Sequence, residues 1–209
     1  MPSKYRLRYL FAPLIKLLSK GLIKIGVTPN LATIFMLCFA ILSFIWISIF
    51  QNLLIFSIFV FTTGIMDGCD GAIARLKNQI SKFGGFFDSV MDRISEFIIF
   101  LGLIIFNWNY YLWGFFDMKI ILLISYFISF MISYCRARAE VFFKGDFDIG
   151  LMARSERLFY LFITMLLSFF YGFTAEFLFI YMCLVAITYV YRAKKISNQI
   201  KQEENLKNI

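Results

Sequence analysis

The stretch MDGCDGAIARLKNQISKFGGFFDSVMD, residues 66–92, decides both the fold and the chemistry of this chain. It carries four aspartates within segments that are otherwise apolar enough to cross a membrane: Asp67, Asp70, Asp88 and Asp92. An ionised carboxylate in hydrocarbon costs at least ~2.5 kcal/mol, so four of them in neighbouring apolar segments need a cationic partner. The sequence therefore predicts that divalent metal ions neutralise these side chains.

The spacing of these residues places them on two helix faces. On the first helix, intervals of three and four residues align carboxylates and small residues, with an arginine beside them. These residues are Asp67, Asp70, Gly71, Ala74 and Arg75. The same intervals align a second set on the next helix: Gly84, Asp88 and Asp92. Two carboxylate pairs on adjacent antiparallel helices can hold two ions roughly 3.5–4 Å apart, and oxygen ligands alone select Mg²⁺ or Mn²⁺.

The composition is typical of an integral membrane protein with one domain. The chain has 209 residues, of which 61% are hydrophobic and 20% aromatic, and its mean hydropathy is +0.78. Histidine is absent, which excludes imidazole bases and imidazole metal sites, so the chemistry must use carboxylates, arginines and hydroxyls. The cysteines lack any paired spacing, so neither a disulfide framework nor a zinc site is expected, and Cys69 is interpreted as a packing residue.

Six apolar stretches approach the ~20 residues that a membrane-spanning helix needs. They cover residues 31–50, 53–76, 83–107, 118–140, 155–172 and 174–192. Before them, apolar residues at helical spacing alternate with lysines and arginines, which favours an amphipathic helix lying on anionic lipid over a solvated basic tail. We therefore expect an all-α integral membrane protein with an interfacial arm over 1–27, six transmembrane helices over 28–192 and a charged cytoplasmic tail over 193–209.

The positive charges indicate the orientation in the membrane. All lysines and arginines except Arg93 and Lys119 lie in the N-terminal arm, the 75–82 turn, the 136–157 segment or the tail after Tyr191. Cytoplasmic loops carry such an excess, so we expect both termini and the aspartates on the cytoplasmic side. The net charge of +8 then reflects topology, and no nucleic-acid partner is expected.

Arginines at the ends of three further helices fall on the same side as the aspartates. Arg136, Arg154 and Arg192 could converge into an anion pocket, because guanidinium groups match phosphate oxygens with paired hydrogen bonds. Lysines in these regions are interpreted as markers of the cytoplasmic boundary. The glycines of the aspartate stretch favour either close approach of a flat ligand or tight packing of helices.

The complete pattern resembles the signature of the CDP-alcohol phosphotransferases: Asp67-x₂-Asp70-Gly71-x₂-Ala74-Arg75-x₈-Gly84-x₃-Asp88-x₃-Asp92. In that family a second alcohol attacks the β-phosphate of a CDP-linked lipid or alcohol, and CMP is released. The resemblance implies two divalent cations, Mg²⁺ or Mn²⁺, held by Asp67, Asp70, Asp88 and Asp92. It also implies that Asp92 takes the proton from the attacking hydroxyl, and that the protein is a homodimer.

The same resemblance assigns the CDP-binding residues, which are Gly71, Ala74, Arg75 and Gly84. The segment TPNLAT, residues 28–33, resembles the family's entry to the first helix, where Asn30 and Thr33 would approach the nucleotide. Capping of that helix is an equally good interpretation of the segment. Glu96, four residues beyond Asp92, is interpreted as a hydrogen-bonded structural group.

The segments SYCRARAE (133–140) and GLMARSERL (150–158) are similar to the branch that uses inositol 1-phosphate as acceptor. That resemblance implies an acceptor-phosphate pocket made by Ser133, Arg136, Arg154 and Arg192. Ala153 stands where this branch usually has an acidic residue, which leaves glycerol phosphate open as the acceptor. The lipid of the CDP-linked substrate could be diacylglycerol or archaeol.

Two other classes of protein also place carboxylates in apolar segments. A cation transporter needs polar residues that continue toward the far side of the membrane, whereas FIIFLGLIIF, residues 97–106, follows the aspartates. A non-catalytic scaffold has no need for four aspartates together. The sequence thus favours the transferase over both alternatives.

Overall fold

The computed structural model describes residues 10–142 and 150–207. Within these ranges the chain is almost entirely helical, with one short antiparallel hairpin that pairs Tyr111 with Asp117. The elements are α2 (Ala12–Lys24), α3 (Pro29–Phe50), α4 (Leu53–Leu76), α5 (Lys82–Phe106), β1 (Tyr111–Leu112), β2 (Phe116–Asp117), α6 (Met118–Phe142), α7 (Arg154–Tyr171) and α8 (Thr174–Lys207).

Side-chain caps fix the beginnings of the three helices that carry most of the site. The Thr28 hydroxyl accepts a hydrogen bond from the Leu31 amide at 3.3 Å, and Pro29 occupies the first turn of α3. Asn52 caps α4 in the same way, and Ser81 caps α5 by accepting from the Gly84 amide at 2.9 Å. The expectation that TPNLAT caps a helix is therefore confirmed for Thr28.

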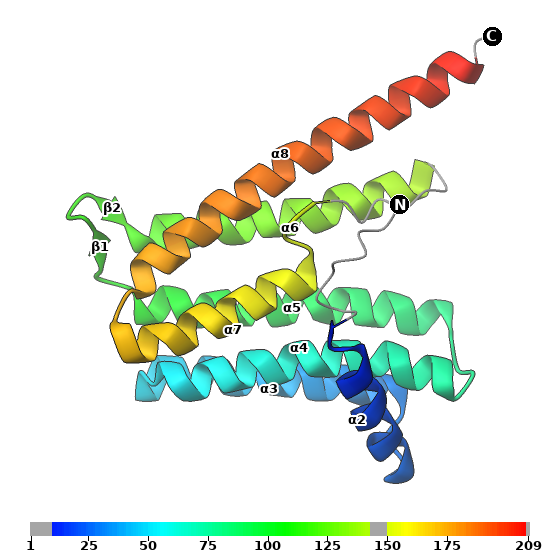
Figure 1. Cartoon of the computed structure of the whole chain (residues 1–209), viewed down its shortest axis with the longest axis horizontal. Coiled ribbons are helices and arrows are strands. Elements are labelled where there is room, and N and C mark those ends of the chain that lie inside the picture. Colours follow the sequence, from blue (N-terminus) through cyan, green and yellow to red (C-terminus); the bar gives the residue numbers. More distant parts are fainter. Residues whose placement is uncertain (1–9, 143–149, 208–209) are drawn as a thin grey trace.

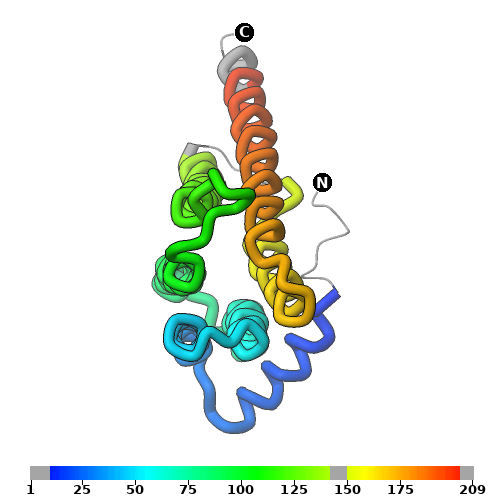
Figure 2. Tube along the Cα trace, turned by 90° about the vertical axis from the view of Figure 1, so that its left-hand side faces the viewer, coloured from blue at the N-terminus to red at the C-terminus, as the bar shows by residue number. Residues whose placement is uncertain are grey.

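The long helices lie roughly along one direction, and the short helix α2 crosses them steeply (Figure 1). Helix α3 packs along both α4 and α5, while α4 also contacts α2 and α7, and α6 packs against α8. In the end-on view the helices surround a common interior, with α7 and α8 opposite α5 and α6 (Figure 2). Helix α8 continues well beyond the bundle on the side where α4 turns into α5 (Figure 1).

Buried apolar side chains form two main groups in the bundle, and a small third group joins α6 and α8 through Ala139 and Ile196. The larger group joins α3–α8 and includes Phe56, Phe100 and Tyr181. The smaller group lies where α2 meets α3 and α4, and it contains Cys69, whose side chain is fully buried. Cys69 thus packs as the sequence predicts. Many large apolar side chains on the outer faces of the bundle are exposed, Phe127 at 62% among them, as expected for a surface that faces lipid.

All six predicted apolar segments are helices, and four of them are long and apolar enough to cross a membrane: α3, α4, α6 and α8. Helices α5 and α7 are excluded from that count because of their charges. Asp92, Arg93 and Glu96 interrupt the apolar run of α5, whereas α7 begins with Arg154, Glu156 and Arg157. The chain is a multi-pass membrane protein, and Asp92, Glu96 and Arg157 of these two helices are buried in its interior.

The structure adds detail to the predicted N-terminal arm and C-terminal tail, and it contains one hairpin that was not predicted. Helix α2 forms inside the predicted N-terminal arm, whose first cations, Lys4, Arg6 and Arg8, lie outside the described residues, as does Lys144. The predicted tail after residue 192 continues α8 without a break as far as Lys207. The hairpin at 111–117 was not expected, because two-residue strands leave no periodic pattern in the sequence.

Candidate active site

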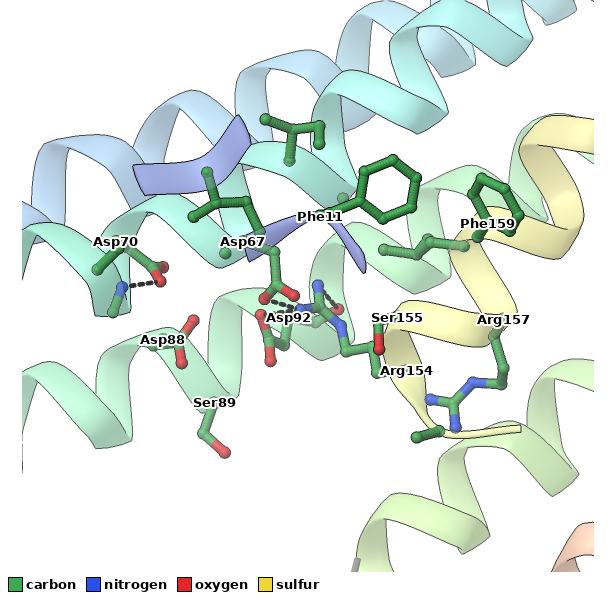
Figure 3. A pocket seen from close by; sticks show the side chains of 18 of the residues that line it. Phe11, Asp67, Asp70, Asp88, Ser89, Asp92, Arg154, Ser155, Arg157 and Phe159 are labelled. Atoms are coloured by element: carbon green, nitrogen blue, oxygen red, sulfur yellow. Dashed lines mark hydrogen bonds and ion pairs between the residues drawn. The ribbon is translucent and has the colours of Figure 1, made fainter. Parts of the chain in front are cut away.

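The site lies between α4 and α5, which pack far more closely on α3 than on each other. Three carboxylates meet in the gap between them: Asp67 from α4 and Asp88 and Asp92 from α5. One oxygen from each lies within 4.8 Å of the others, and Asp92 is only 8% exposed. Figure 3 shows Asp67 and Asp92 pointing toward each other with Asp88 beside them.

The fourth predicted ligand, Asp70, points in a different direction from Asp67. Its Oδ2 atom accepts a hydrogen bond from the Thr33 hydroxyl of α3 at 2.8 Å, and its Oδ1 accepts from the Gly71 amide at 2.5 Å. A spacing of three residues rotates a side chain by about 60° around a helix, which turns Asp70 toward α3. The structure therefore brings three of the four aspartates into one cluster and leaves Asp70 at its edge.

Arg154 reaches into this cluster from the first turn of α7. Its Nη1 atom forms an ion pair with Asp67 Oδ1 and a second with Asp92 Oδ1 at 2.6 Å (Figure 3). The Nη2 atom lies 3.5 Å from Met36 Sδ and 3.4 Å from the Asp92 carbonyl oxygen. The sequence placed Arg154 in a phosphate pocket, whereas here the aspartates hold its guanidinium, because they are the nearest uncompensated anions.

The potential metal ligands of the cluster suit a hard divalent cation. Every potential ligand atom is a carboxylate oxygen, which is the ligand type that Mg²⁺ and Mn²⁺ prefer. The Oδ1 atom of Asp88 is buried and accepts no hydrogen bond within the described part of the chain. A buried anionic oxygen without a donor is costly, and a cation beside it would remove that cost.

A cavity of about 490 Å³ opens on one side of the aspartates. All six residues that the resemblance assigns to CDP line it: Asn30, Thr33, Gly71, Ala74, Arg75 and Gly84. A Cβ atom built on Gly84 would lie 3.0 Å from Ser81 Oγ and 3.7 Å from Asn30 Oδ1. One built on Gly71 would lie 3.3 Å from Arg75 Nη1. These two glycines therefore leave room beside polar cavity-lining groups.

Gly68 allows tight packing of helices, the second role that the sequence suggests for the glycines of this stretch. A Cβ atom there would lie 2.5 Å from the end of the Ile15 side chain on α2. Gly68 therefore allows α2 to lie close against α4, as small residues commonly do between helices. The two interpretations of the glycines thus apply to different positions in the same stretch.

A larger cavity of about 780 Å³ opens on the other side of the aspartates. It is lined by all four residues assigned to the acceptor phosphate: Ser133, Arg136, Arg154 and Arg192. Arg136 Nε donates to Glu140 at 2.8 Å, and Arg192 Nη1 donates to the Ile132 carbonyl at 3.1 Å. The two cavities share Asp70, Gly71, Arg75 and Asp88 in their walls, so they meet at the aspartates.

Arg93 and Arg157 are among the charged residues that line this cavity but were not predicted as site residues. Arg157 is 1% exposed and donates to both carboxylate oxygens of Glu96, as well as to Ser133 Oγ at 3.3 Å. Arg93 donates to the carbonyl and hydroxyl oxygens of Ser89 and lies 3.6 Å from an Asp92 oxygen. Arg157 follows Arg154 by three residues, a helical interval that could have indicated a shared face.

Comparison with known proteins agrees with this geometry. A family model described as CDP-alcohol phosphatidyltransferase matches residues 26–191. Archaetidylinositol phosphate synthase from Pyrococcus horikoshii is 34% identical over 154 residues, covering 72% of this chain and 76% of that protein. Phosphatidylinositol phosphate synthase from Mycobacteroides abscessus is 32% identical over 152 residues, covering 72% of this chain and 67% of the other.

Solved structures of phosphatidylinositol phosphate synthase from Mycobacterium tuberculosis have the same fold. One with CDP-DAG bound superposes with a TM-score of 0.74 at 26% identity, covering 88% of this chain and 94% of the other. Another, in complex with manganese and citrate, gives a TM-score of 0.75 at 26% identity and covers 87% and 88% of the two chains. The protein therefore belongs to the CDP-alcohol phosphatidyltransferase family and is a CMP-releasing phosphotransferase of the membrane.

Proposed function

We propose that this enzyme transfers a phosphatidyl-type group from a CDP-linked lipid to a phosphorylated alcohol and releases CMP. The first candidate for this alcohol is inositol 1-phosphate. The observation that carries the proposal is the meeting of two cavities at the aspartate cluster. The smaller is lined mainly by small and polar residues, whereas several arginines and a group of apolar side chains line the larger. A donor and an acceptor held in these cavities would face each other across the carboxylates.

In this proposal Asp67, Asp70, Asp88 and Asp92 hold two divalent cations, Mg²⁺ or Mn²⁺. Two observations support the assignment. Asp67, Asp88 and Asp92 converge, and the buried Oδ1 atom of Asp88 has no hydrogen-bond partner in the described part of the chain. Bound metal ions would neutralise the diphosphate and the developing charge on the leaving CMP. Asp70 would join the ligands while Thr33 keeps its carboxylate oriented through their hydrogen bond.

The cytidine diphosphate part of the donor would occupy the smaller cavity. Gly71, Ala74 and Gly84 allow a flat ligand to approach the helix backbones, and the Arg75 guanidinium offers paired hydrogen bonds to phosphate oxygens. Asn30 lies beside Gly84 at the cavity wall, where its amide can bind a polar group of the nucleotide. The lipid, diacylglycerol or archaeol, would extend from the diphosphate into the surrounding bilayer.

Asp92 would act as the base that receives the proton of the attacking hydroxyl. It lines the larger cavity and not the smaller one, so it faces the acceptor. As the hydroxyl oxygen forms a bond to the β-phosphorus, its proton passes to an Asp92 carboxylate oxygen and the bond from that phosphorus to the CMP oxygen breaks. Because an aspartate is a weak base, Asp92 would work mainly through its position next to the hydroxyl.

The phosphate of the acceptor would bind to Ser133, Arg136, Arg154 and Arg192. Two similar proteins are named as inositol phosphate-type synthases, which favours inositol 1-phosphate as the acceptor. Ala153, which is buried and lines the same cavity, is the departure that keeps glycerol phosphate as a second candidate. Both acceptors carry the phosphate that an arginine pocket would bind.

We also propose six membrane spans, with α5 and α7 crossing as the two charged helices. Successive long helices alternate in direction, and the turn between α4 and α5 and the end of α6 lie at the same end, whereas α7 begins nearer the middle of the bundle (Figure 1). Arginines and lysines concentrate at that end, which would face the cytoplasm together with both termini. Helix α2 would lie in the membrane interface there, and the enzyme would act as a homodimer.

Measuring CMP release from the purified protein tests this function. The reaction needs CDP-diacylglycerol or CDP-archaeol with inositol 1-phosphate, glycerol 3-phosphate or free inositol, each with Mg²⁺, Mn²⁺ or EDTA. We expect metal-dependent release with inositol 1-phosphate and little with free inositol. Faster release with glycerol phosphate would reassign the acceptor, whereas absence of CMP with every acceptor would contradict the proposed transfer and leave the transporter class to test by ion flux.

A further inference from the structure

The contacts of Arg154 differ from those of an arginine with a fixed structural role. Its Nη1 atom donates a hydrogen bond to Asp67 and forms ion pairs with both the Asp67 and the Asp92 carboxylates. The Nη2 atom makes only long hydrogen bonds, to the Met36 thioether at 3.5 Å and to the Asp92 carbonyl at 3.4 Å, and Nε is buried without an acceptor in the described part of the structure. All contacts with the two carboxylates therefore pass through one nitrogen of this guanidinium.

Arg157, one turn further along α7, provides the comparison within the same helix. Its Nε, Nη1 and Nη2 atoms all donate, to Glu96 Oε1 at 2.9 Å, to the Met152 carbonyl at 3.3 Å and to Glu96 Oε2 at 3.0 Å. Such a network fixes the plane of the guanidinium as well as its charge. Arg154 contacts each of its two carboxylates through Nη1 alone, so its side chain can leave its partners at a smaller cost.

A divalent cation and the Arg154 guanidinium would compete for the same oxygens. One oxygen from each of Asp67, Asp88 and Asp92 lies within 4.8 Å of the others, and the Arg154 Nη1 atom already contacts oxygens of Asp67 and Asp92. An arginine does not lose its proton in proteins, so it cannot avoid repulsion by an ion through deprotonation. The ion pairs with Asp67 and Asp92 would therefore have to break when metal binds.

The larger cavity offers the displaced side chain a place to go. Arg154 lines this cavity together with Arg136, Arg192 and Ser133. A change of rotamer would move its guanidinium from the carboxylates toward these groups. There it would meet other cations, which is favourable only when an anion lies among them.

We propose that Arg154 is a tethered counter-ion, which neutralises Asp67 and Asp92 while no divalent ion is bound and completes the acceptor-anion site once an ion displaces it. The inference rests on the proposed function, because it takes these aspartates as metal ligands. Metal and acceptor anion then favour each other's binding through one side chain, and by linkage the effect is reciprocal. Arg154 would thus make the acceptor site complete only in the metal-loaded enzyme.

Binding of Mn²⁺ to the purified protein in detergent tests this role, with the free ion measured by electron paramagnetic resonance. We expect Arg154→Met to bind Mn²⁺ at least roughly tenfold more tightly than the wild type, because the internal competitor is gone. Arg154→Lys keeps the competing charge and should stay closer to the wild type. Arg136→Met removes one charge from the same cavity at a position paired with Glu140, and should change the affinity less than about twofold.

A second measurement uses the wild-type protein alone, so that it does not depend on whether a variant folds. Sulfate, which carries the charge of a phosphate but binds metal weakly, should tighten Mn²⁺ binding by holding the displaced guanidinium. Unchanged Mn²⁺ affinity in sulfate, or an Arg154→Met variant that binds Mn²⁺ no more tightly than the wild type, would overturn the inference while leaving the proposed metal site intact. Failure of every variant to bind Mn²⁺ would overturn the metal site itself.

Discussion

Arg157 on α7 donates to both carboxylate oxygens of Glu96 on α5, from Nε at 2.9 Å and from Nη2 at 3.0 Å. Both side chains are almost completely buried, at 1% and 5% exposure. The same guanidinium donates to Ser133 on α6 and to the Met152 carbonyl just before α7. The ion pair and the hydrogen bond to Ser133 therefore join three helices at the wall of the larger cavity, where Arg157 contacts the Ser133 hydroxyl.

Breaking this pair should strongly destabilise the protein. Replacing Arg157 by methionine leaves the Glu96 carboxylate buried without its partner, which typically costs about 3–5 kcal/mol. We expect a correspondingly lower midpoint of unfolding in detergent micelles. Glu140→Gln breaks the Arg136–Glu140 pair, whose side chains are 46% and 47% exposed, and should cost less than about 1 kcal/mol.

The double variant Glu96→Met with Arg157→Met shows whether stability is lost because a charge is left unpaired or because side-chain packing is lost. Removal of both charges leaves no unpaired ion, so the double variant should be more stable than Arg157→Met alone. If both variants unfold at the same midpoint, the loss comes from missing side-chain volume, and the ion pair does not have the role described here.

Asp92→Asn should remove most of the activity while the protein stays folded. The amide cannot accept the proton of an attacking hydroxyl, and general bases typically contribute about 10²–10⁴-fold to the rate. CMP release with saturating CDP-lipid and acceptor measures the loss. Asp117→Asn, at the opposite end of the bundle, is the control for removal of an acidic charge. An active Asp92→Asn enzyme would contradict the assignment of Asp92 as the base.

The helices could be predicted closely because their signals are local. The segment predicted at 53–76 is α4, with the same limits, and α3 begins at Pro29, where Thr28 caps it. The aspartate stripes also follow from helical spacing alone. By contrast, the hydrogen bond from Thr33 to Asp70 joins residues 37 positions apart, and the pairing of Arg157 with Glu96 joins residues 61 apart. These partners depend on how helices pack, and no spacing within one helix specifies that.

Arg154 illustrates the same limit within the site. It begins α7 and lines one cavity together with Ser133, Arg136 and Arg192, the residues with which the sequence grouped it. Its ionic partners, Asp67 and Asp92, come from two other helices and become neighbours only because α4 and α5 both pack on α3. The sequence thus indicates which residues are charged, whereas the packing decides which charges meet.

Thr33→Val should weaken metal binding through Asp70. The valine keeps the shape of the threonine but cannot donate to Asp70 Oδ2, which now receives the hydroxyl at 2.8 Å. A hydrogen bond to a charged group contributes about 1.5–3 kcal/mol, so we expect Mn²⁺ affinity to fall by roughly ten- to a hundredfold. Thr33→Ser retains the donor and should recover most of the affinity. Equal affinities in the valine and serine variants would show that Asp70 does not need this donor.

Gly84→Ala and Gly21→Ala form a matched pair of glycine changes within helices. A Cβ atom on Gly84 would lie 3.0 Å from Ser81 Oγ and 3.7 Å from Asn30 Oδ1, at the wall of the smaller cavity. A Cβ atom on Gly21 in α2 would meet nothing within 4 Å, and Gly21 does not line either cavity.

We expect Gly84→Ala to raise the KM for the CDP-lipid, because the added methyl group narrows the space proposed for the nucleotide. Gly21→Ala should leave KM unchanged and stabilise its helix by up to about 1 kcal/mol. Initial rates of CMP release against CDP-lipid concentration compare the two variants, and an equal KM in both would argue against nucleotide binding beside Gly84.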